Sequence, residues 1–209
     1  MTTWLHIVGI GEDGIDMLPA SARNLIKNAE VLVGGERHLA MVPEDHPADR
    51  HRWEAPLRKT IARLDTMRGK RVVVLATGDP MSYGIGVTLT RKFGTKAVSV
   101  QPVAGAFSLA AARMGWPLHD VDCLTLHGRP LELLNLYLRH SGRLLIMSEN
   151  RNTPAQVAAA LCANGYGPST LTVFDHMGGP KEASHEELAH DWGERRTTDF
   201  NTIAVNCVA

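Results

Sequence analysis

Short, continuously apolar runs alternate with longer mixed segments along the first half of the chain. Runs such as Val72–Leu75 are rich in β-branched residues, which is typical of strands buried on both faces of a sheet. Strands that alternate with helices in this way favour a mostly parallel sheet covered by helices on both faces. The expected strands are 4–8, 31–33, 72–75 and 97–100, and the expected helices are 20–26, 57–67, 86–93 and the alanine-rich stretch that ends at Met114.

The pattern changes around Gly115-Trp116-Pro117, after which strands follow one another with less helix between them. Successive strands near the end of the chain predict a mixed sheet, and hence a second α/β domain. We therefore expect an α/β protein with an N-terminal domain at 1–116, a C-terminal domain at 117–209 and a cleft between them. Strands are expected at 123–127, 144–147, 170–174 and 202–208 and helices at 131–139 and 154–163, while the stretch 43–56, with three prolines, is expected to be a loop.

Composition and charge exclude several classes of function. Lysine plus arginine and aspartate plus glutamate each number 22, so no net positive field attracts nucleic acid. The apolar runs are far shorter than the roughly 20 residues that span a bilayer, and no basic segment precedes the first apolar run as it does in an export signal. Cys123, Cys162 and Cys207 are scattered, which favours a reducing compartment over a disulfide framework or a metal site. We expect a cytoplasmic protein that binds neither membranes nor metal.

Polar residues follow several predicted strands directly. After the Val72–Leu75 run comes Thr77-Gly78-Asp79-Pro80, in which Gly78 tolerates unusual dihedral angles and Pro80 bars Asp79 from helical geometry. A plain turn is enough to explain this segment in isolation. His127-Gly128-Arg129 and Ser148-Glu149-Asn150 also follow strands, however, and open α/β sheets bind ligands at the carboxyl ends of their strands. The shared position therefore predicts a ligand site.

Two further motifs suggest chemistry that their spacing argues against. Gly9-x-Gly11-x-x-Gly14 matches the dinucleotide-binding pattern, but a helix that begins at Pro19 starts too far beyond these glycines to direct its amide groups at a diphosphate. No acidic residue ends the second strand, so we disfavour nicotinamide or flavin binding. His185 and His190 are five residues apart, instead of the four of a zinc-binding helix, which favours a solvated loop or strand there.

Several segments together resemble a known family. They are Val8–Gly14, Val33–Leu39, Leu75–Pro80 with Tyr83-Gly84, Ala106–Ala110, Gly115–Leu118 and Leu126–Pro130. Over nearly its whole length the sequence is similar to the tetrapyrrole methylases of cobalamin and sirohaem synthesis. The Gly-Gly-Glu-Arg-His-Leu, Ala-Phe-Ser and Leu-His-Gly-Arg-Pro segments look like the C5-methylating branch of that family. Glu12-Asp13 stands where family members often have proline, which agrees with this branch.

The resemblance implies a fold, a cofactor and a substrate. Members of the family have two α/β domains with S-adenosylmethionine bound between them, usually in a homodimer, and the substrate here is a precorrin. Because the sulfonium of this cofactor is already an activated electrophile, the protein needs only to align the substrate and exclude water. Asp79 is the candidate catalytic residue, which orients substrate or cofactor or helps to remove a proton. The expected cofactor-binding residues are Gly9, Gly11, Thr77, Gly78, Asp79, Met81, Phe107, Ser108, Met147 and Ser148.

The implied substrate is a large apolar macrocycle fringed with carboxylates. Because the chain is neutral overall, positive charge must gather locally, and arginine is suited to bidentate carboxylate contacts. For Arg113, at the end of a helix, a plain solvated charge is an equal alternative. The candidate substrate-binding residues are Arg37, His38, Tyr83, Arg113, His127 and Arg129.

Two questions about the activity stay open. Because the chain ends soon after its last expected strand, it is either a stand-alone C5 enzyme or a module of a longer protein. In the second case a further domain or subunit methylates C15 and decarboxylates the substrate. The alternatives to C5 methylation are methylation at another position of the macrocycle and a non-catalytic tetrapyrrole-binding module that works with a separate decarboxylating methyltransferase.

Overall fold

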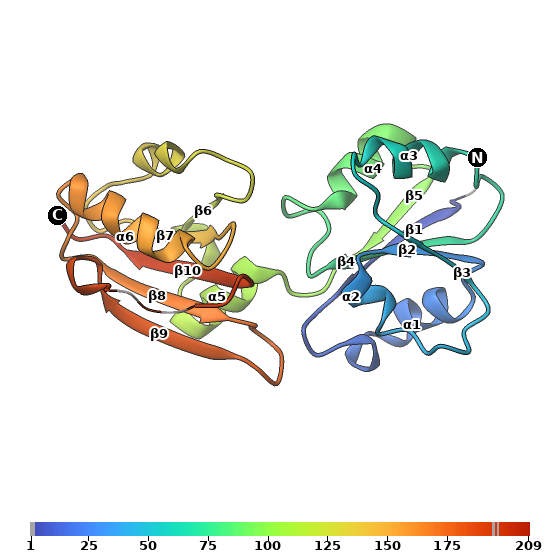
Figure 1. Ribbon diagram of the computed structural model, residues 1–209, viewed down its shortest axis with the longest axis horizontal. Coiled ribbons are helices and arrows are strands. Elements are labelled where there is room, and N and C mark those ends of the chain that lie inside the picture. The colour runs from blue at the N-terminus through green and yellow to red at the C-terminus, as the bar shows by residue number, and fades with distance from the viewer. Residues whose placement is uncertain (1–2, 194, 196) are drawn as a thin grey trace. The chain divides into compact units, whose positions relative to one another are not determined.

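Five parallel strands form the sheet of the first unit, in the order β3–β2–β4–β1–β5 (Figure 1). The computed structural model describes residues 3–193, 195 and 197–209, and its chain divides into a first unit that ends at Gly105 and a second unit that begins at Ala106. The predicted parallel sheet is thus confirmed. Its strands are β1 (Leu5–Ile10), β2 (Val31–Gly34), β3 (Asp49–Arg52), β4 (Val72–Thr77) and β5 (Val98–Gln101).

Helices cover both faces of this sheet, which explains why its central strands are mostly apolar. In β4, Val73 and Leu75 share a core with α1 and α2, while Val72 and Val74 share a separate core with α3 and α4 on the opposite face. The helices of this unit are η1 (Ile15–Met17), α1 (Ala20–Lys27), α2 (Glu36–Leu39), α3 (Arg58–Asp65) and α4 (Ile85–Phe93).

The sheet of the second unit is mixed, as predicted, with the strand order β6–β7–β10–β8–β9. β6 and β7 run parallel, and the other neighbouring strands are antiparallel. One face packs on α5 and the other on α6. The elements are α5 (Ala106–Met114), η2 (Leu118–Asp120), β6 (Asp122–Thr125), η3 (Leu131–Leu136), β7 (Arg143–Met147), α6 (Thr153–Ala163), β8 (Thr170–Asp175), β9 (Ala183–Leu188), η4 (Ala189–Asp191) and β10 (Asn201–Asn206).

The division between the units falls before α5, whereas the sequence pattern placed a domain boundary after residue 116. Phe107 and Ala110 of α5 pack with Leu145 of β7 and Ala204 of β10, so this helix belongs to the core of the second unit. The sequence conceals this because α5 follows β5 as though the alternation of strand and helix simply continued.

β3 and η3 are among the segments that differ from their expected structure. β3 lies inside the stretch 43–56 that was expected to be a loop, and it pairs with β2 at the edge of the first sheet. Its side chains, Asp-Arg-His-Arg, are polar because backbone hydrogen bonds hold an edge strand without an apolar face. The helix expected at 131–139 is the shorter 3₁₀ helix η3, which ends at Leu136.

Candidate functional site

The carboxyl ends of β1 and β4 meet at a backbone contact that requires glycine. A Cβ atom added at Gly9 would lie 1.9 Å from the carbonyl oxygen of Gly78. Gly78 has a φ of 57°, and its amide donates to the carbonyl of Ile10 (2.9 Å). The carbonyl of Gly78 accepts a hydrogen bond from the amide of Val103 (3.2 Å). The turn after β4 therefore lies directly over the end of β1.

Hydrogen bonds within the Gly-Asp-Pro loop fix its shape. Asp79 Oδ1 accepts from the amide of Met81 (2.8 Å), and the carbonyl of Pro80 accepts from the amide of Gly86 (2.9 Å). A Cβ atom at Gly84 or Gly86 would lie 2.6 or 2.7 Å from that same carbonyl oxygen. Both glycines are thus needed where the chain enters α4, and the loop has a fixed shape.

Asp79 offers a hydrogen-bond acceptor in this loop. Its side chain is half-buried, and a Cβ atom at Gly105 would lie 3.1 Å from Asp79 Cβ, so the segment after β5 passes close by. Within the described part of the chain, Asp79 Oδ2 accepts no hydrogen bond. Next to it, Met81 and Tyr83 are 45% and 51% exposed. A carboxylate oxygen flanked by exposed side chains suits a ligand hydroxyl or ammonium group.

A polar cluster beside the loop joins the ends of β1, β2 and β4. Its members are Glu12, which follows β1, Arg37 and His38 on α2, and Thr77 at the end of β4. Arg37 Nη1 pairs with Glu12, and Arg37 Nη2 lies 3.2 Å from His38 Nε2 and 3.4 Å from Thr77 Oγ1. Thr77 Oγ1 lies 3.3 Å from His38 Nε2. The structure thus brings together one residue predicted for the cofactor and two predicted for the substrate.

Burial sets the charge of His38. His38 is only 7% exposed. Burial first, and then the charge of Arg37, lower the pKa of His38 from 6.5 to about 4. The ring is therefore neutral at pH 7. Substrate binding by His38 stays a prediction, but at that pH the ring has no positive charge with which to hold a carboxylate.

Four residues predicted to bind the cofactor lie in the second unit. Phe107 is 9% exposed and packs with Met147 in the core beneath α5, whereas Ser108 is exposed. Ser148, directly after β7, donates from Oγ to Oδ1 of Asn201 (2.5 Å). Asn201 is buried at the start of β10, so this hydrogen bond fixes the end of β7 against the neighbouring strand.

Arg113 forms a bidentate ion pair. Its Nε and Nη2 donate to Oε1 and Oε2 of Glu182 (2.8 and 2.9 Å), and Glu182 Oε2 also accepts from the amide of Gly178 (2.6 Å). These hydrogen bonds raise the pKa of Arg113 and lower that of Glu182. Arg113 is thus an exposed charge that also has an ion-pair partner, and substrate binding by Arg113 stays a prediction. The pair ties the end of α5 to the turn between β8 and β9.

Glu182→Gln is expected to lower the free energy of unfolding by about 0.5 to 1 kcal/mol at pH 7, as exposed ion pairs usually do. The lowered pKa of Glu182 means that its contribution is complete above the ordinary value of 4.5 and fades as the pH falls below it. The difference from wild type should shrink accordingly in urea unfolding at lower pH. Arg113→Gln serves as the matched variant, and losses that add up in the double variant would contradict the pairing.

His127 and Arg129 are exposed on the loop after β6. The backbone amide of His127 donates a hydrogen bond to Thr125 Oγ1 (3.1 Å). Arg129 borders a shallow pocket of about 210 Å³ at the ends of β6 and β7, beside the start of α6. The other residues that line the pocket are Leu126, Leu131, Glu149, Thr153 and Gln156.

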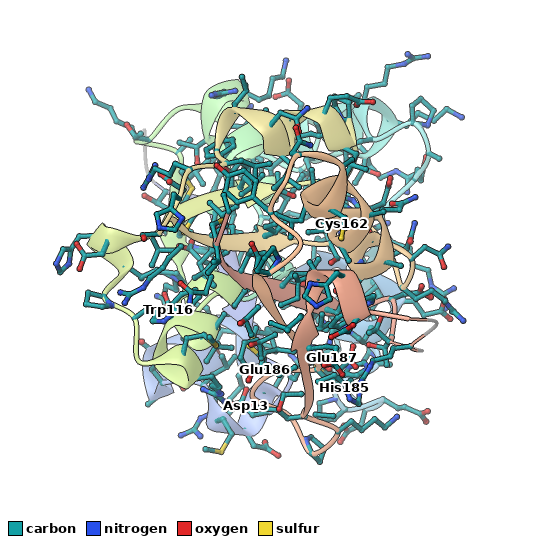
Figure 2. All side chains as sticks on the ribbon, turned by 90° about the vertical axis from the view of Figure 1, so that its left-hand side faces the viewer. Asp13, Trp116, Cys162, His185, Glu186 and Glu187 are labelled. Carbon is teal, nitrogen blue, oxygen red and sulfur yellow. The ribbon has the colours of Figure 1, made fainter. Side chains whose placement is uncertain are left out.

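The glycine motif at 9–14 and the His185–His190 segment lack the helices that dinucleotide and zinc binding would need. η1 begins directly after Gly14 but has only three residues, and α1 begins at Ala20, so the amide groups of α1 do not belong to the glycine loop. His185 lies on the edge strand β9 with Glu186 and Glu187, as Figure 2 shows, and His190 lies on η4. The segment is thus a strand and not a zinc-binding helix.

The residues that the structure describes contain neither a metal-binding cluster nor a helix that could cross a membrane. No group of three or more His, Cys, Asp or Glu side chains there could hold a metal ion. No helix among those residues combines the length and the hydropathy needed to cross a lipid bilayer.

Comparison with known families decides what kind of protein this is. The family "Tetrapyrrole (Corrin/Porphyrin) Methylases" matches residues 4–190. The chain belongs to this tetrapyrrole methylase family. The resemblance found in the sequence is thereby confirmed, and the match extends over both units.

Relatives of this tetrapyrrole methylase carry specific names. It is 38% identical over 209 residues to a "Precorrin-6Y C(5,15)-methyltransferase (decarboxylating)" of a Sinorhizobium species, covering 100% of the chain and 51% of the relative. The chain thus spans about half the length of that relative. It is 29% identical over 181 residues to the "Cobalt-precorrin-7 C(5)-methyltransferase" of Salmonella typhimurium, covering 87% of the chain and 89% of the relative.

A solved structure confirms the tetrapyrrole methylase fold. The uroporphyrin-III C-methyl transferase of Thermus thermophilus, crystallised with S-adenosyl homocysteine, superposes with a TM-score of 0.73. The match covers 97% of this chain and 96% of that one at 19% sequence identity. At this identity the likeness concerns the fold alone.

Sequence reasoning missed several residues that shape the candidate site of this tetrapyrrole methylase. Glu12 could have been noticed, because it stands where the family often has proline, but nothing near it in the sequence indicates that it pairs with Arg37. Asn201 and Glu182 carried no local signal. They are paired with Ser148 and Arg113, which lie far away in the sequence.

Proposed function

We propose that the chain is an S-adenosylmethionine-dependent methyltransferase that methylates C5 of a precorrin in cobalamin biosynthesis. The observation that supports this best is the pair of relatives, one named for C5 and C15 and the other for C5 alone. C5 is the position that the two names share. Because the chain spans about half of the longer relative, we assign it the C5 step and assign C15 methylation and decarboxylation to another domain or subunit.

The residues at the ends of β1 and β4 fit an adenosyl cofactor. Asp79 Oδ2 is an acceptor for a hydroxyl or ammonium group, and the bare backbone of Gly78 allows a close approach. In the second unit, Ser108 presents an exposed hydroxyl at the start of α5. We propose that the cofactor is held by the residues predicted from the sequence, which are Gly9, Gly11, Thr77, Gly78, Asp79, Met81, Phe107, Ser108, Met147 and Ser148.

The chain's own residues then act by positioning. When bound, S-adenosylmethionine supplies a methyl group on a positively charged sulfur, which needs no further activation. The protein must hold C5 of the macrocycle in line with the methyl–sulfur bond and keep water away. In this proposal Asp79 orients the bound molecules through Oδ2 or accepts the proton that the methylated carbon loses. The preorganised Gly-Asp-Pro loop keeps that carboxylate in place between turnovers.

Arg129→Ala is expected to weaken binding of the macrocycle about tenfold and to leave cofactor affinity within about twofold of wild type. An exposed guanidinium beside a pocket suits a carboxylate on the edge of the substrate, whereas the proposed cofactor site uses other residues. Titration with each ligand separately measures both affinities. Arg58→Ala, an exposed arginine at the start of α3, is the control, and equal weakening in both variants would remove the specific role of Arg129.

Calorimetry with S-adenosylmethionine and S-adenosylhomocysteine tests the cofactor, and incubation with a precorrin tests the reaction. We expect both nucleosides to bind and the product to carry its new methyl group on C5, located by NMR. A methyl group elsewhere on the ring would overturn the C5 assignment alone. Macrocycle binding without methyl transfer would make the chain a tetrapyrrole-binding module that needs its C15-methylating partner.

The proposal includes a homodimer in the cytoplasm. Sedimentation of the purified chain tests the dimer, and a single species with the mass of one chain would overturn it. Fractionation of the cells that produce the protein tests its location.

A further inference from the structure

His38 lies where three segments of the first unit meet. Its ring is on α2 and contacts Thr77, which ends β4, and Arg37, which in turn pairs with Glu12 after β1. Thr77 directly precedes Gly78, and Glu12 directly follows Gly11. The two glycine-containing loops assigned to the cofactor are therefore connected through a single short chain of side chains.

The hydrogen bonds specify the state of the imidazole. A guanidinium group only donates, so His38 Nε2, at 3.2 Å from Arg37 Nη2, must accept. The ring proton then lies on Nδ1. A second proton, on Nε2, would point an N–H group at the guanidinium and break this hydrogen bond. Burial and the charge of Arg37 both oppose that proton, which agrees with the lowered pKa of about 4.

The guanidinium of Arg37 contacts the ring of His38, Thr77 and Glu12. Arg37 Nη2 reaches both His38 Nε2 and Thr77 Oγ1, while Nη1 pairs with Glu12. Glu12 thus supplies the negative charge that balances Arg37, and Thr77 is held from the side by two groups of α2. Removal of the Nε2 acceptor would take one hydrogen-bond acceptor from Arg37 Nη2 and one of the two α2 contacts from Thr77 Oγ1.

We propose that His38 is a positioning residue for the methyl transfer, whose neutral ring holds Arg37 and Thr77 and thereby sets the Gly-Asp-Pro loop against the first glycine loop. This inference rests on the proposed function of the chain. It replaces the substrate contact that the sequence suggested for His38, because the ring is buried and its accepting nitrogen is already occupied by groups of the protein.

Two variants separate this role from simple packing. His38→Gln keeps a hydrogen-bond acceptor near the position of Nε2, whereas His38→Leu has a similar volume and no acceptor. In the absence of any ligand, exchange of the Gly78 amide, which donates to the carbonyl of Ile10, should be at least about tenfold faster in His38→Leu and within about twofold of wild type in His38→Gln. The dissociation constant for S-adenosylhomocysteine should follow the same order, about tenfold higher in His38→Leu only.

A second measurement avoids substitution. ¹⁵N NMR of wild-type protein should show His38 neutral and protonated on Nδ1 from pH 5 to pH 7, and a proton on Nε2 in that range would overturn the proposal. If His38→Leu fails to fold, the variants Thr77→Val and Thr77→Ser are compared in place of the two His38 variants. Exchange of the Gly78 amide is then expected to be faster in Thr77→Val than in Thr77→Ser.

The outcomes distinguish this inference from the proposed function. Equal effects of leucine and glutamine, or no effect of leucine, would reduce His38 to a packing residue and overturn the inference. A different result would instead overturn the proposed function: wild type binds no S-adenosylhomocysteine, although Gly78 exchange in His38→Leu and His38→Gln differs from wild type as expected.

Discussion

Gly9→Ala is expected to lower the free energy of unfolding by about 3 kcal/mol or more, at the upper end of what overpacking costs. The added Cβ would lie 1.9 Å from the carbonyl oxygen of Gly78 and 3.2 Å from Pro80 Cδ. The turn cannot retreat easily, because Gly78 is hydrogen-bonded to Ile10 on one side and to Val103 on the other. Urea unfolding followed by circular dichroism measures the loss. In the protein that remains folded, displacement of the turn should also weaken binding of S-adenosylhomocysteine.

Gly35→Ala is the matched control for this substitution. Gly35 has an ordinary φ of −68°, and the nearest atom to an added Cβ is His38 Nδ1 at 3.8 Å, which is a normal van der Waals contact. We expect its free energy of unfolding to stay within about 0.5 kcal/mol of wild type. Similar stabilities for the two variants would show that the turn over β1 shifts without cost, contrary to the packing described above.

Asp79→Asn is expected to lower turnover about 100-fold while changing the free energy of unfolding by less than about 0.5 kcal/mol. The asparagine oxygen can still accept the hydrogen bond that Asp79 Oδ1 receives from Met81, so the loop keeps its shape. What disappears is the negative charge and the second carboxylate oxygen. Steady-state methyl-transfer rates, beside urea unfolding, separate the two effects.

Asp79→Ala removes the internal hydrogen bond as well. It should lose a further 1 kcal/mol or so of stability but little more activity, since the carboxylate is already gone in the asparagine variant. Asp45→Asn, which neutralises an exposed carboxylate before β3, is the control for a change in net charge and should be fully active. If activity and stability fell in proportion in both Asp79 variants, Asp79 would be no more than a structural turn residue.

Much of the fold could be predicted because local patterns report burial. Val72–Leu75 is apolar at successive positions because β4 is covered on both faces, and a strand of this kind is visible in the sequence alone. The turn at Gly78 was equally visible, since glycine followed by Asp-Pro limits the backbone to a few conformations. β3 was missed for the converse reason, because a polar edge strand leaves no pattern in its side chains.

The candidate site could be predicted only in part. Residues at the ends of strands were found from their position, but their partners were not. Nothing near Arg113 indicates that it pairs with Glu182, and nothing near Ser148 indicates Asn201. The same holds for His38, because nothing in the sequence indicates that the neighbouring Arg37 donates a hydrogen bond to its ring.

By itself, then, the sequence determined most of the buried strands and helices, the presence of two sheets and the loops with glycine at the strand ends, because backbone preference and burial act over a few residues. Only the tertiary structure decided that α5 joins the second core and that Glu12, Arg37, His38 and Thr77 form one cluster. The physical reason is that the partner of a side chain depends on which strand ends the sheet places together, and several arrangements of the same elements satisfy the local pattern equally well.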